Sequence, residues 1–324
     1  MTTSVAPLVS ILVVTYRKHE LFGRCFASLV AGTDGLDVEY VVVVNGPRRE
    51  PEHEAAARAG ATVVRPGVNL GLAGGLHAAR AVARGRYLLV VQEDVEVQPG
   101  WLPPLLEVFA DDPSVGAVTS RVEYEDGAVQ HEGWIIVRDA SVLAVGDDDH
   151  PGPRRAVDSG GTASLLVAAE AWDAIGGPDP DLYPLWYVDV DLGLGLARAG
   201  WNVMVEPRSR VRHRAHSSTS VPFRAYLSHR NGPRVVRRYA DLLATRPERE
   251  ETPQFVAAQL ERCAGEAERR RAQTRTTVRA TAPPTTAQLV RRARRQQWSV
   301  RLGYPMWRVR RRLARLRSAS ARGR

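Results

Sequence analysis

The chain has 324 residues, 44% of them hydrophobic, which is enough to bury one large core in an α/β domain. No stretch reaches the roughly 20 uncharged apolar residues of a membrane span, and two distant cysteines support neither a disulfide framework nor a zinc site. The net charge of +9 arises from residues 291–324, which hold thirteen arginines and no acidic residue, so residues 1–290 carry −4. A cytoplasmic protein is therefore predicted, and nucleic acid is not an expected partner because no nucleic-acid-binding motif accompanies the basic tail.

Strands and helices alternate over the first ninety residues. Apolar, β-branched runs predict strands, and helical periodicity predicts helices between them. The predicted strands are Leu8–Val14, Glu39–Val44, Ala61–Arg65 and Tyr87–Gln92, and the predicted helices are Glu20–Val30, Glu52–Ala59 and Ala73–Arg84. This alternation predicts a mostly parallel sheet that binds ligands at the carboxyl ends of its strands.

The pattern is more irregular over residues 100–165, where a hairpin of Trp134–Val137 and Ser141–Val145 is expected. An apolar strand within 157–167, helices at 169–175 and 189–199, and a strand at 202–205 follow. After Gly232-Pro233 the chain becomes rich in Arg, Ala, Glu and Leu. We therefore expect one domain over residues 1–232 and a helical, Arg-rich extension over residues 233–324.

Glu93 and Asp94 close the predicted strand that ends at Gln92. Ionised carboxylates are costly to bury unpaired, so packing explains them poorly. A hard divalent cation that bridges a diphosphate needs one or two such oxygens. A solvated turn is an equally good explanation from the spacing alone.

Residues 68–75 form a glycine-rich segment between a strand and a helix. Its glycines would let backbone N–H groups approach an anion at the helix N-terminus. The spacing is not G-x-G-x-x-G and the segment does not follow the first strand, so a dehydrogenase is only weakly indicated. A tight turn with close helix packing explains the glycines equally well.

Asp189 and Asp191 open a predicted helix, where about 100° per residue points them to nearly opposite sides. Asp189 is expected at the N-cap, which can also face a cleft. Further on, two histidines and two arginines within residues 212–216 suit a metal ligand with diphosphate clamps, or a solvated basic loop.

Taken in order, these segments resemble family 2 glycosyltransferases, particularly the bacterial rhamnosyltransferase-like branch. The matching strings are Val9-Ser10-Ile11-Leu12-Val13-Val14-Thr15-Tyr16-Arg17, Val43-Val44-Asn45-Gly46, Asn69-Leu70-Gly71, Gln92-Glu93-Asp94, Asp126-Gly127-Ala128-Val129-Gln130, Gly176-Gly177-Pro178-Asp179, Asp189-Val190-Asp191-Leu192 and His213. The resemblance spans residues 8–216 and implies a GT-A fold, a Rossmann-like α/β architecture with a mostly parallel sheet.

The resemblance also implies inverting transfer from a UDP- or dTDP-linked sugar to an acceptor hydroxyl of a glycan, a lipid-linked intermediate or a small molecule. It places a divalent metal, Mn²⁺ or Mg²⁺, at Asp94 and His213. The catalytic base is assigned to Asp189, with Asp191 as the second candidate. The residues implied in binding the nucleotide are Thr15, Tyr16, Arg17, Asn45, Asn69, Gly71 and Glu93.

Three positions depart from the family pattern. Val44 replaces an Asp that contacts the nucleoside, Val188 replaces the first acid of the motif around the base, and Gly195 replaces an Arg. Val188 leaves open a degenerate GT-A module that binds a nucleotide sugar or a partner without turnover. A nucleotidyltransferase shares the α/β layout, but Thr15-Tyr16-Arg17-Lys18 lacks the glycine-rich loop that such enzymes carry near the first strand.

The basic tail shows a helical pattern of its own. Met306, Val309, Leu313 and Leu316 recur at 3-4-3 spacing among arginines, which predicts one apolar stripe on a helix. This pattern is typical of an interfacial anchor on anionic lipid and indicates a peripheral position on the inner face of the membrane. A helix docked on the acidic body and a disordered tail are the two alternatives.

Overall fold

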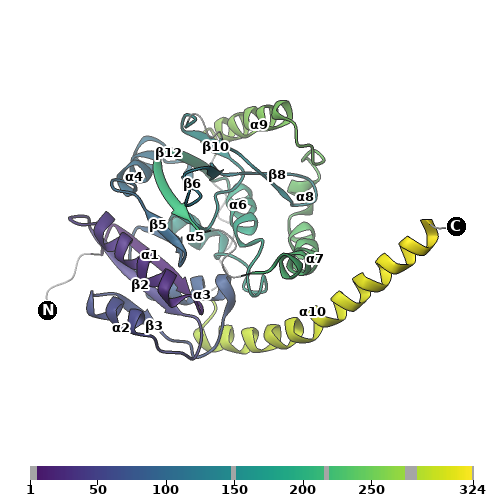
Figure 1. Cartoon of the computed structure of the whole chain (residues 1–324). Coiled ribbons are helices and arrows are strands. Elements are labelled where there is room, and N and C mark those ends of the chain that lie inside the picture. The colour runs from purple at the N-terminus through teal and green to yellow at the C-terminus, as the bar shows by residue number, and fades with distance from the viewer. Residues whose placement is uncertain (1–5, 147–150, 215–218, 274–282, 323–324) are drawn as a thin grey trace.

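The computed structural model describes residues 6–146, 151–214, 219–273 and 283–322, with side chains up to residue 314. A ten-stranded sheet forms its centre (Figure 1). Its main path runs β10 (Arg155–Val157), β12 (Asn202–His213), β6 (Val115–Glu123), β11 (Ser164–Ala168), β4 (Tyr87–Gln92), β1 (Val9–Thr15), β2 (Val38–Val44) and β3 (Thr62–Val64). Beside this path, β5 (Val95–Val97) pairs with β12, β7 (Val129–His131) pairs with β6, and β8 (Trp134–Ile136) forms a separate hairpin with β9 (Val142–Ala144).

Most strands on the main path point the same way. β1, β2, β3 and β4 are parallel neighbours, as are β6 and β12, and β11 joins the two groups by running antiparallel to both β4 and β6. The mostly parallel sheet predicted from the sequence is confirmed, and the antiparallel strand β11 is an addition that was not predicted. The carboxyl ends of β4 and β12 consequently lie at the same edge of the sheet.

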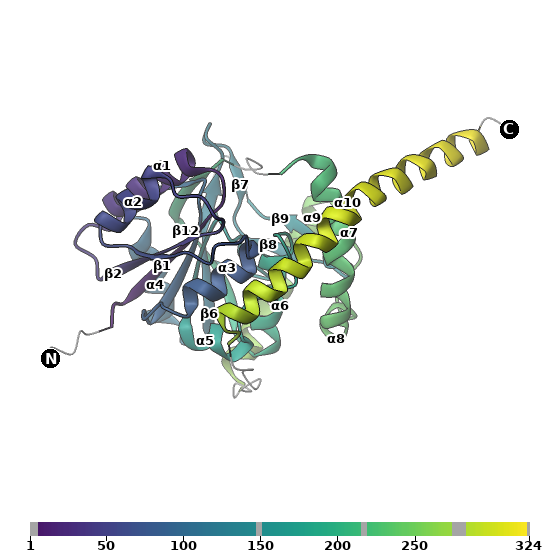
Figure 2. The same cartoon turned by 90° about the horizontal axis from the view of Figure 1, so that it is seen from below.

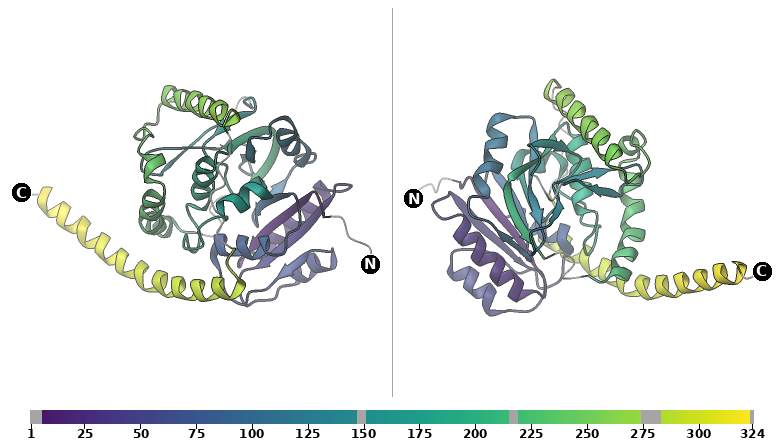
Figure 3. Two further views of the ribbon diagram at one scale, coloured as in Figure 1. Left: turned by 180° about the vertical axis from the view of Figure 1, so that it is seen from behind. Right: turned by 45° about the horizontal axis from the view of Figure 1, so that its top comes forward.

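Helices cover both faces of the sheet, which explains why the strands are continuous apolar runs (Figure 3). Ile11 and Val13 belong to one buried core and Leu12 to the other, because successive side chains point to opposite faces. The first core packs under α1 (His19–Gly32), α2 (Pro51–Arg58), α4 (Leu102–Asp111) and α9 (Pro253–Arg271). The second packs under α3 (Gly71–Arg80), α5 (Ala169–Ile175), α6 (Val188–Arg198), α7 (Val221–Arg238), α8 (Ala240–Leu243) and the base of α10 (Thr286–Arg322).

The structure contains two elements within residues 100–123 that the sequence pattern did not reveal, α4 and β6. The first turn of α4 holds Pro103 and Pro104, which a helix tolerates there although they suggest a loop in a sequence. β6 is buried along its whole length, yet it carries polar and charged side chains that pair with neighbouring segments. Those polar residues concealed a central strand.

The basic segment that was expected to be a loop also differs from the prediction. β12 continues to His213, so Arg212 and His213 belong to the sheet. Ala215 and His216 lie outside the described residues. The predicted boundary between residues 232 and 233 falls within α7, and the division into a domain and an extension stays a prediction.

The helices after α7 pack partly on the sheet domain. Asp158 forms buried ion pairs with Arg246 and Arg262, which fasten α9 and the segment before it beside β10. The first part of α10 contacts α3 and α7, and the remainder extends beyond the body (Figure 2). None of the helices in the described part of the chain is long and apolar enough to cross a membrane.

Candidate active site

Three of the residues singled out in the sequence line one cavity of about 560 Å³. Asp94 follows β4, His213 ends β12, and Asp189 lies in the first turn of α6. The other walls come mainly from residues 161–163 and from the β8–β9 hairpin. The parallel arrangement of β4 and β12 thus brings together residues that are more than one hundred positions apart in the chain.

Asp94 and His213 face each other across a short gap. The distance between His213 Nε2 and Asp94 Oδ1 is 3.3 Å, and both side chains are largely buried. His213 Nδ1 lies 2.7 Å from Gln130 Oε1, and an amide oxygen can only accept, so Nδ1 carries the hydrogen. The Nε2 lone pair of the neutral ring then meets a carboxylate oxygen. A positive charge between these atoms, either a proton on Nε2 or a divalent cation, would stabilise the pair.

The pair fits a metal whose remaining ligands come from a substrate. Across the described residues there is no group of three or more His, Cys, Asp and Glu side chains placed to hold a metal ion. One oxygen and one nitrogen donor leave most coordination positions to phosphate oxygens and water, as is common for a cation that bridges a diphosphate. The nitrogen donor suits Mn²⁺ better than Mg²⁺, which prefers oxygen ligands.

Asp189 presents a carboxylate to the cavity, and no described residue forms an ion pair with it. Its Oδ1 accepts a hydrogen bond of 2.9 Å from Val190 N, and burial raises the pKa of the carboxyl. The chain enters α6 through Trp186 and Tyr187, whose φ angles are 84° and 70°. Tyr187, not Asp189, is the N-cap, so the expectation that Asp189 caps the helix was wrong. These positive φ angles set the start of α6 beside the cavity.

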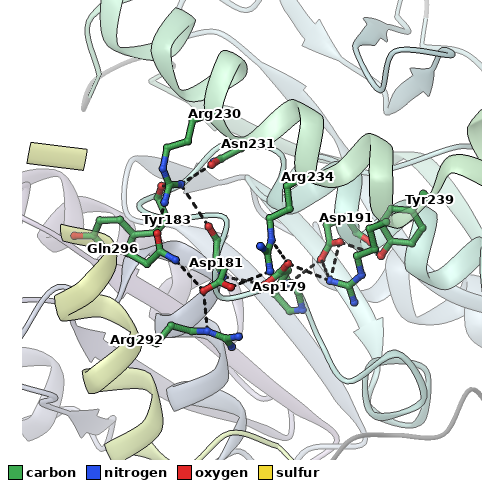
Figure 4. Close-up of polar contacts among 12 residues, drawn as sticks. Asp179, Asp181, Tyr183, Asp191, Arg230, Asn231, Arg234, Tyr239, Arg292 and Gln296 are labelled. Carbon is green, nitrogen blue, oxygen red and sulfur yellow. Dashed lines mark hydrogen bonds and ion pairs between the residues drawn. The ribbon is translucent and has the colours of Figure 1, made fainter. Parts of the chain in front are cut away.

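Asp191 points away from the cavity into a network between α6 and α7, as predicted from the helical periodicity (Figure 4). Its carboxylate accepts hydrogen bonds from Tyr239 Oη at 2.9 Å and from Asp179 N at 2.7 Å. Arg238 Nη1 lies 3.2 Å from Asp191 Oδ1. These contacts account for the burial of Asp191, and its place as the second candidate for the base stays a prediction.

Glu93 stabilises the turn that follows β1. Its carboxylate accepts a hydrogen bond of 2.8 Å from Tyr16 N and another from the Thr15 side chain, and burial raises its pKa to about 7. Arg17 has a φ of 65°, and its guanidinium stacks over the Tyr16 ring at 5.0 Å. Glu93 therefore shapes the segment implied in nucleotide binding but does not line the cavity.

A second turn, at residues 69–71, is held by side-chain hydrogen bonds from Asn45 and Asn69. Asn45 Oδ1 accepts from Leu70 N at 2.6 Å and its Nδ2 donates to Gly71 O at 3.1 Å, while Asn69 Oδ1 accepts from Gly71 N at 2.8 Å. Gly71 has a φ of 74°, and a Cβ there would lie 2.8 Å from Pro184 O. The side chains of this turn bond to its own backbone. None of the seven residues implied in nucleotide binding lines the cavity, and that role stays a prediction.

Sequence reasoning missed much of the cavity wall. Tyr124, Trp134, Trp186 and Tyr187 line it, and aromatic side chains pack well against sugar rings. Trp134 Nε1 and Gln130 Nε2 are buried donors with no acceptor in the part of the chain that the structure describes. A buried donor without a partner costs about 1–3 kcal/mol, so a bound molecule that supplies oxygens would be stabilised there. Only Gln130 belonged to a string quoted from the sequence.

The positions that depart from the family pattern have structural explanations. Val44 and Val188 are buried in the two cores of the domain. A Cβ on Gly195 would lie 3.3 Å from Tyr239 Oη, so a larger residue would press on the ring that holds Asp191. These three substitutions fit packing, and none of them adds a charge to the cavity.

Comparisons with known proteins agree with this arrangement. Residues 10–134 match the sequence model of glycosyl transferase family 2. An N-acetylglucosaminyl-diphospho-decaprenol L-rhamnosyltransferase of Mycobacterium tuberculosis is 27% identical over 251 residues, which cover 68% of this chain and 80% of the relative. These matches support a family 2 glycosyltransferase of the rhamnosyltransferase-like branch.

Other relatives in sequence are much longer proteins. Uncharacterized protein y4gI of Sinorhizobium fredii is 28% identical over 230 residues, which are 66% of this chain and 25% of that protein. O-antigen biosynthesis protein RfbC of Myxococcus xanthus is 30% identical over 155 residues, which are 43% of this chain and 11% of that protein. This chain thus spans a quarter or less of these two relatives.

Solved structures show the same GT-A fold. GalNAc-T7 with UDP, GalNAc and Mn²⁺ aligns with a TM-score of 0.60 and 15% identity over 74% of this chain and 50% of that one. A mannosyltransferase of Pyrobaculum calidifontis in complex with GDP-Man and Mn²⁺ aligns with a TM-score of 0.53 and 16% identity over 94% of this chain and 84% of that one. The fold predicted from the sequence is confirmed.

Proposed function

We propose that the chain transfers a sugar, with inversion, from a UDP- or dTDP-linked donor to an acceptor hydroxyl. The observation that carries this proposal is the position of Asp189, a carboxylate without an ion-pair partner among the described residues, which lines the same cavity as the Asp94–His213 pair. A base on one side and a site for the leaving diphosphate on the other are what the reaction needs. The cavity also offers aromatic walls for sugar rings.

Asp189 would act as the general base. Its carboxylate takes the proton of the acceptor hydroxyl while the hydroxyl oxygen bonds to the anomeric carbon, and the bond from that carbon to the diphosphate oxygen breaks. The nucleotide diphosphate leaves with the electron pair. Because burial raises the pKa of Asp189, the carboxylate is a stronger base than an exposed aspartate.

Asp94 and His213 would hold the divalent metal, Mn²⁺ or Mg²⁺. When bound, the metal offsets the negative charge on the leaving diphosphate. Gln130 orients the His213 ring through Nδ1, which keeps Nε2 directed at Asp94. Two glycosyltransferases with the same fold are in complex with Mn²⁺, which supports this choice.

The two turns beside the cavity would hold the nucleotide. Glu93 fixes the turn of residues 15–17, and Asn45 fixes the turn of residues 69–71. Asn45, Asn69 and Glu93 would contribute by shaping the backbone, because their side chains already bond within these turns.

For the acceptor, we propose a lipid-linked glycan intermediate at the cytoplasmic face of a membrane. The mycobacterial relative is named for a decaprenol-linked diphosphate sugar, and RfbC is named for O-antigen synthesis. Residues 1–232 would carry the transfer, and residues 233–324 would bring the domain to its acceptor. Soluble glycans and small molecules belong in the same assay as alternative acceptors.

The test is nucleotide release measured with UDP-, dTDP- and GDP-sugars, each with and without Mn²⁺ and with each acceptor class. Release that depends on the acceptor, with a product whose anomeric configuration by NMR is opposite to that of the donor, supports inverting transfer. Retained configuration would refute the mechanism. Donor binding by calorimetry without release under any condition would indicate a module that binds without turnover.

A further inference from the structure

Helix α10 carries apolar side chains on two opposite faces. One face docks on the body, where Leu289 and Ala293 are buried and Trp307 packs against Tyr226. The other face is a stripe whose members are each between 50% and 64% exposed. This outward stripe consists of Trp298, Leu302, Met306, Val309 and Leu313. At about 100° per residue the stripe lies roughly opposite to Leu289 and Ala293.

Polar contacts fix which face of α10 meets the body. Arg292 Nε lies 2.7 Å from Asp181 Oδ1, Gln296 Nε2 donates to the same oxygen at 3.0 Å, and Gln297 Nε2 donates to Asn69 O at 3.0 Å. The first two of these contacts appear in Figure 4. The alternative in which the predicted stripe is buried on the acidic body is therefore wrong for Met306, Val309 and Leu313. Leu316 lies beyond the described side chains.

The N-terminal end of α10 lines a basin of about 880 Å³ that is rich in arginine. Its arginines are Arg234, Arg237, Arg238, Arg291, Arg292 and Arg295. Three of them pair with Asp179, Asp181 or Asp191. Arg237, Arg291 and Arg295 form no ion pair with any other described residue, so the basin keeps positive charge. At about 100° per residue, Arg291 and Arg295 lie on the side of α10 that carries the outward stripe.

No acidic residue occurs anywhere in residues 269–324. An exposed apolar stripe whose only charged neighbours along α10 are arginines fits the boundary between lipid tails and anionic headgroups, where apolar side chains leave water and arginines contact phosphates. A second copy of α10 fits less well, since it would bring two arginine-rich faces together.

We propose that the outward stripe of α10 rests on an anionic membrane surface, with the basin arginines on lipid phosphates. Figures 1 and 2 show the distal part of α10 projecting clear of the body, so a flat surface can reach it. The outward stripe and the basin are separate from the cavity that contains Asp94, Asp189 and His213. Membrane binding through them does not depend on which sugar donor the cavity binds. Sugar transfer and membrane binding can accordingly fail independently.

The test is co-sedimentation of the full chain with vesicles of phosphatidylcholine alone or of equimolar phosphatidylcholine and phosphatidylglycerol. We expect the protein to pellet with the anionic vesicles, to dissociate as salt rises, and to stay in solution with the neutral ones. Leu302→Gln, Met306→Gln, Val309→Gln and Leu313→Gln together should weaken binding about tenfold or more. Arg291→Gln and Arg295→Gln should each weaken it by up to about fivefold.

The matched control replaces two exposed apolar residues outside α10, Val82→Gln and Val221→Gln, which should leave binding unchanged. Circular dichroism confirms that each variant is folded. The proposal is overturned if the natural chain ignores anionic vesicles, or if the stripe variant pellets as well as the natural chain. It is also overturned if light scattering shows self-association that the stripe variant abolishes while no form binds vesicles.

Discussion

Asp191→Ala should destabilise the fold by about 1–3 kcal/mol, although the residue lies two positions from the proposed base. The substitution leaves the buried donor Asp179 N without its acceptor, which costs about 1–3 kcal/mol, while Tyr239 Oη keeps the backbone carbonyl of residue 191 at 3.0 Å. Arg238 contributes less, because its side chain is 37% exposed and retains Asp179 at 3.6 Å. The matched change, Asp189→Ala, removes no ion pair with a described residue, and the loss of its part-buried hydrogen bond from Val190 N is offset by removal of a buried charge, so it should cost less than about 1 kcal/mol.

Urea unfolding of both variants and of the natural chain, followed by circular dichroism, measures these differences. Turnover is then compared at a temperature where every form is folded. Asp191→Ala should keep most of its activity per folded molecule, while Asp189→Ala should lose nearly all of it. A stable Asp191→Ala variant that has lost transfer, beside an active Asp189→Ala variant, would refute the division between a structural and a catalytic aspartate.

Removal of the metal and three further substitutions test other parts of the structure. EDTA should abolish transfer, and Asp94→Ala should be nearly inactive yet folded. Full activity in EDTA would refute the assignment of a metal to Asp94 and His213. Glu93 has a folded pKa of about 7, above that of an unfolded Glu, so its burial lowers stability as pH rises from about 4.5 to 7. Above pH 7, the free energy of unfolding of Glu93→Gln should exceed that of the natural chain by up to about 3 kcal/mol, and below pH 4.5 the two should be equal. Urea unfolding at a series of pH values measures this difference. Gly71→Ala should lower the free energy of unfolding by about 1–3 kcal/mol, because the φ angle of Gly71 is positive and an added Cβ would lie too close to Pro184 O. Unchanged stability would contradict that packing.

The bounds of an element were predicted best from the sequence where side chains of one kind fill the whole element. β4 has the predicted bounds Tyr87–Gln92, because an apolar β-branched run buried on both faces has few alternatives. β6 escaped prediction since partners from other segments satisfy its polar side chains, which are Thr119, Ser120, Arg121 and Glu123. Local sequence carries no sign of such partners.

The site was predictable in its charged residues and not in its walls. Asp94, Asp189 and His213 stand at element ends, where a charge without a packing role is visible in the sequence. The helical periodicity also separated Asp189 from Asp191 correctly. Trp134 was placed in a hairpin, but its contact with the cavity depends on how that hairpin folds over the sheet, which no sequence spacing encodes.

The most direct test of the central claim is the transfer rate of Asp189→Asn, with donor affinity measured on the same sample. Asparagine keeps the size of the side chain and an oxygen for the Val190 N–H, but it cannot take a proton. The matched control is Glu248→Gln, which neutralises an exposed carboxylate outside the cavity. We expect kcat to fall by about 10²-fold or more with the donor Kd unchanged, and the control to behave as the natural chain. Transfer by Asp189→Asn at the natural rate would contradict the assignment of Asp189 as the base.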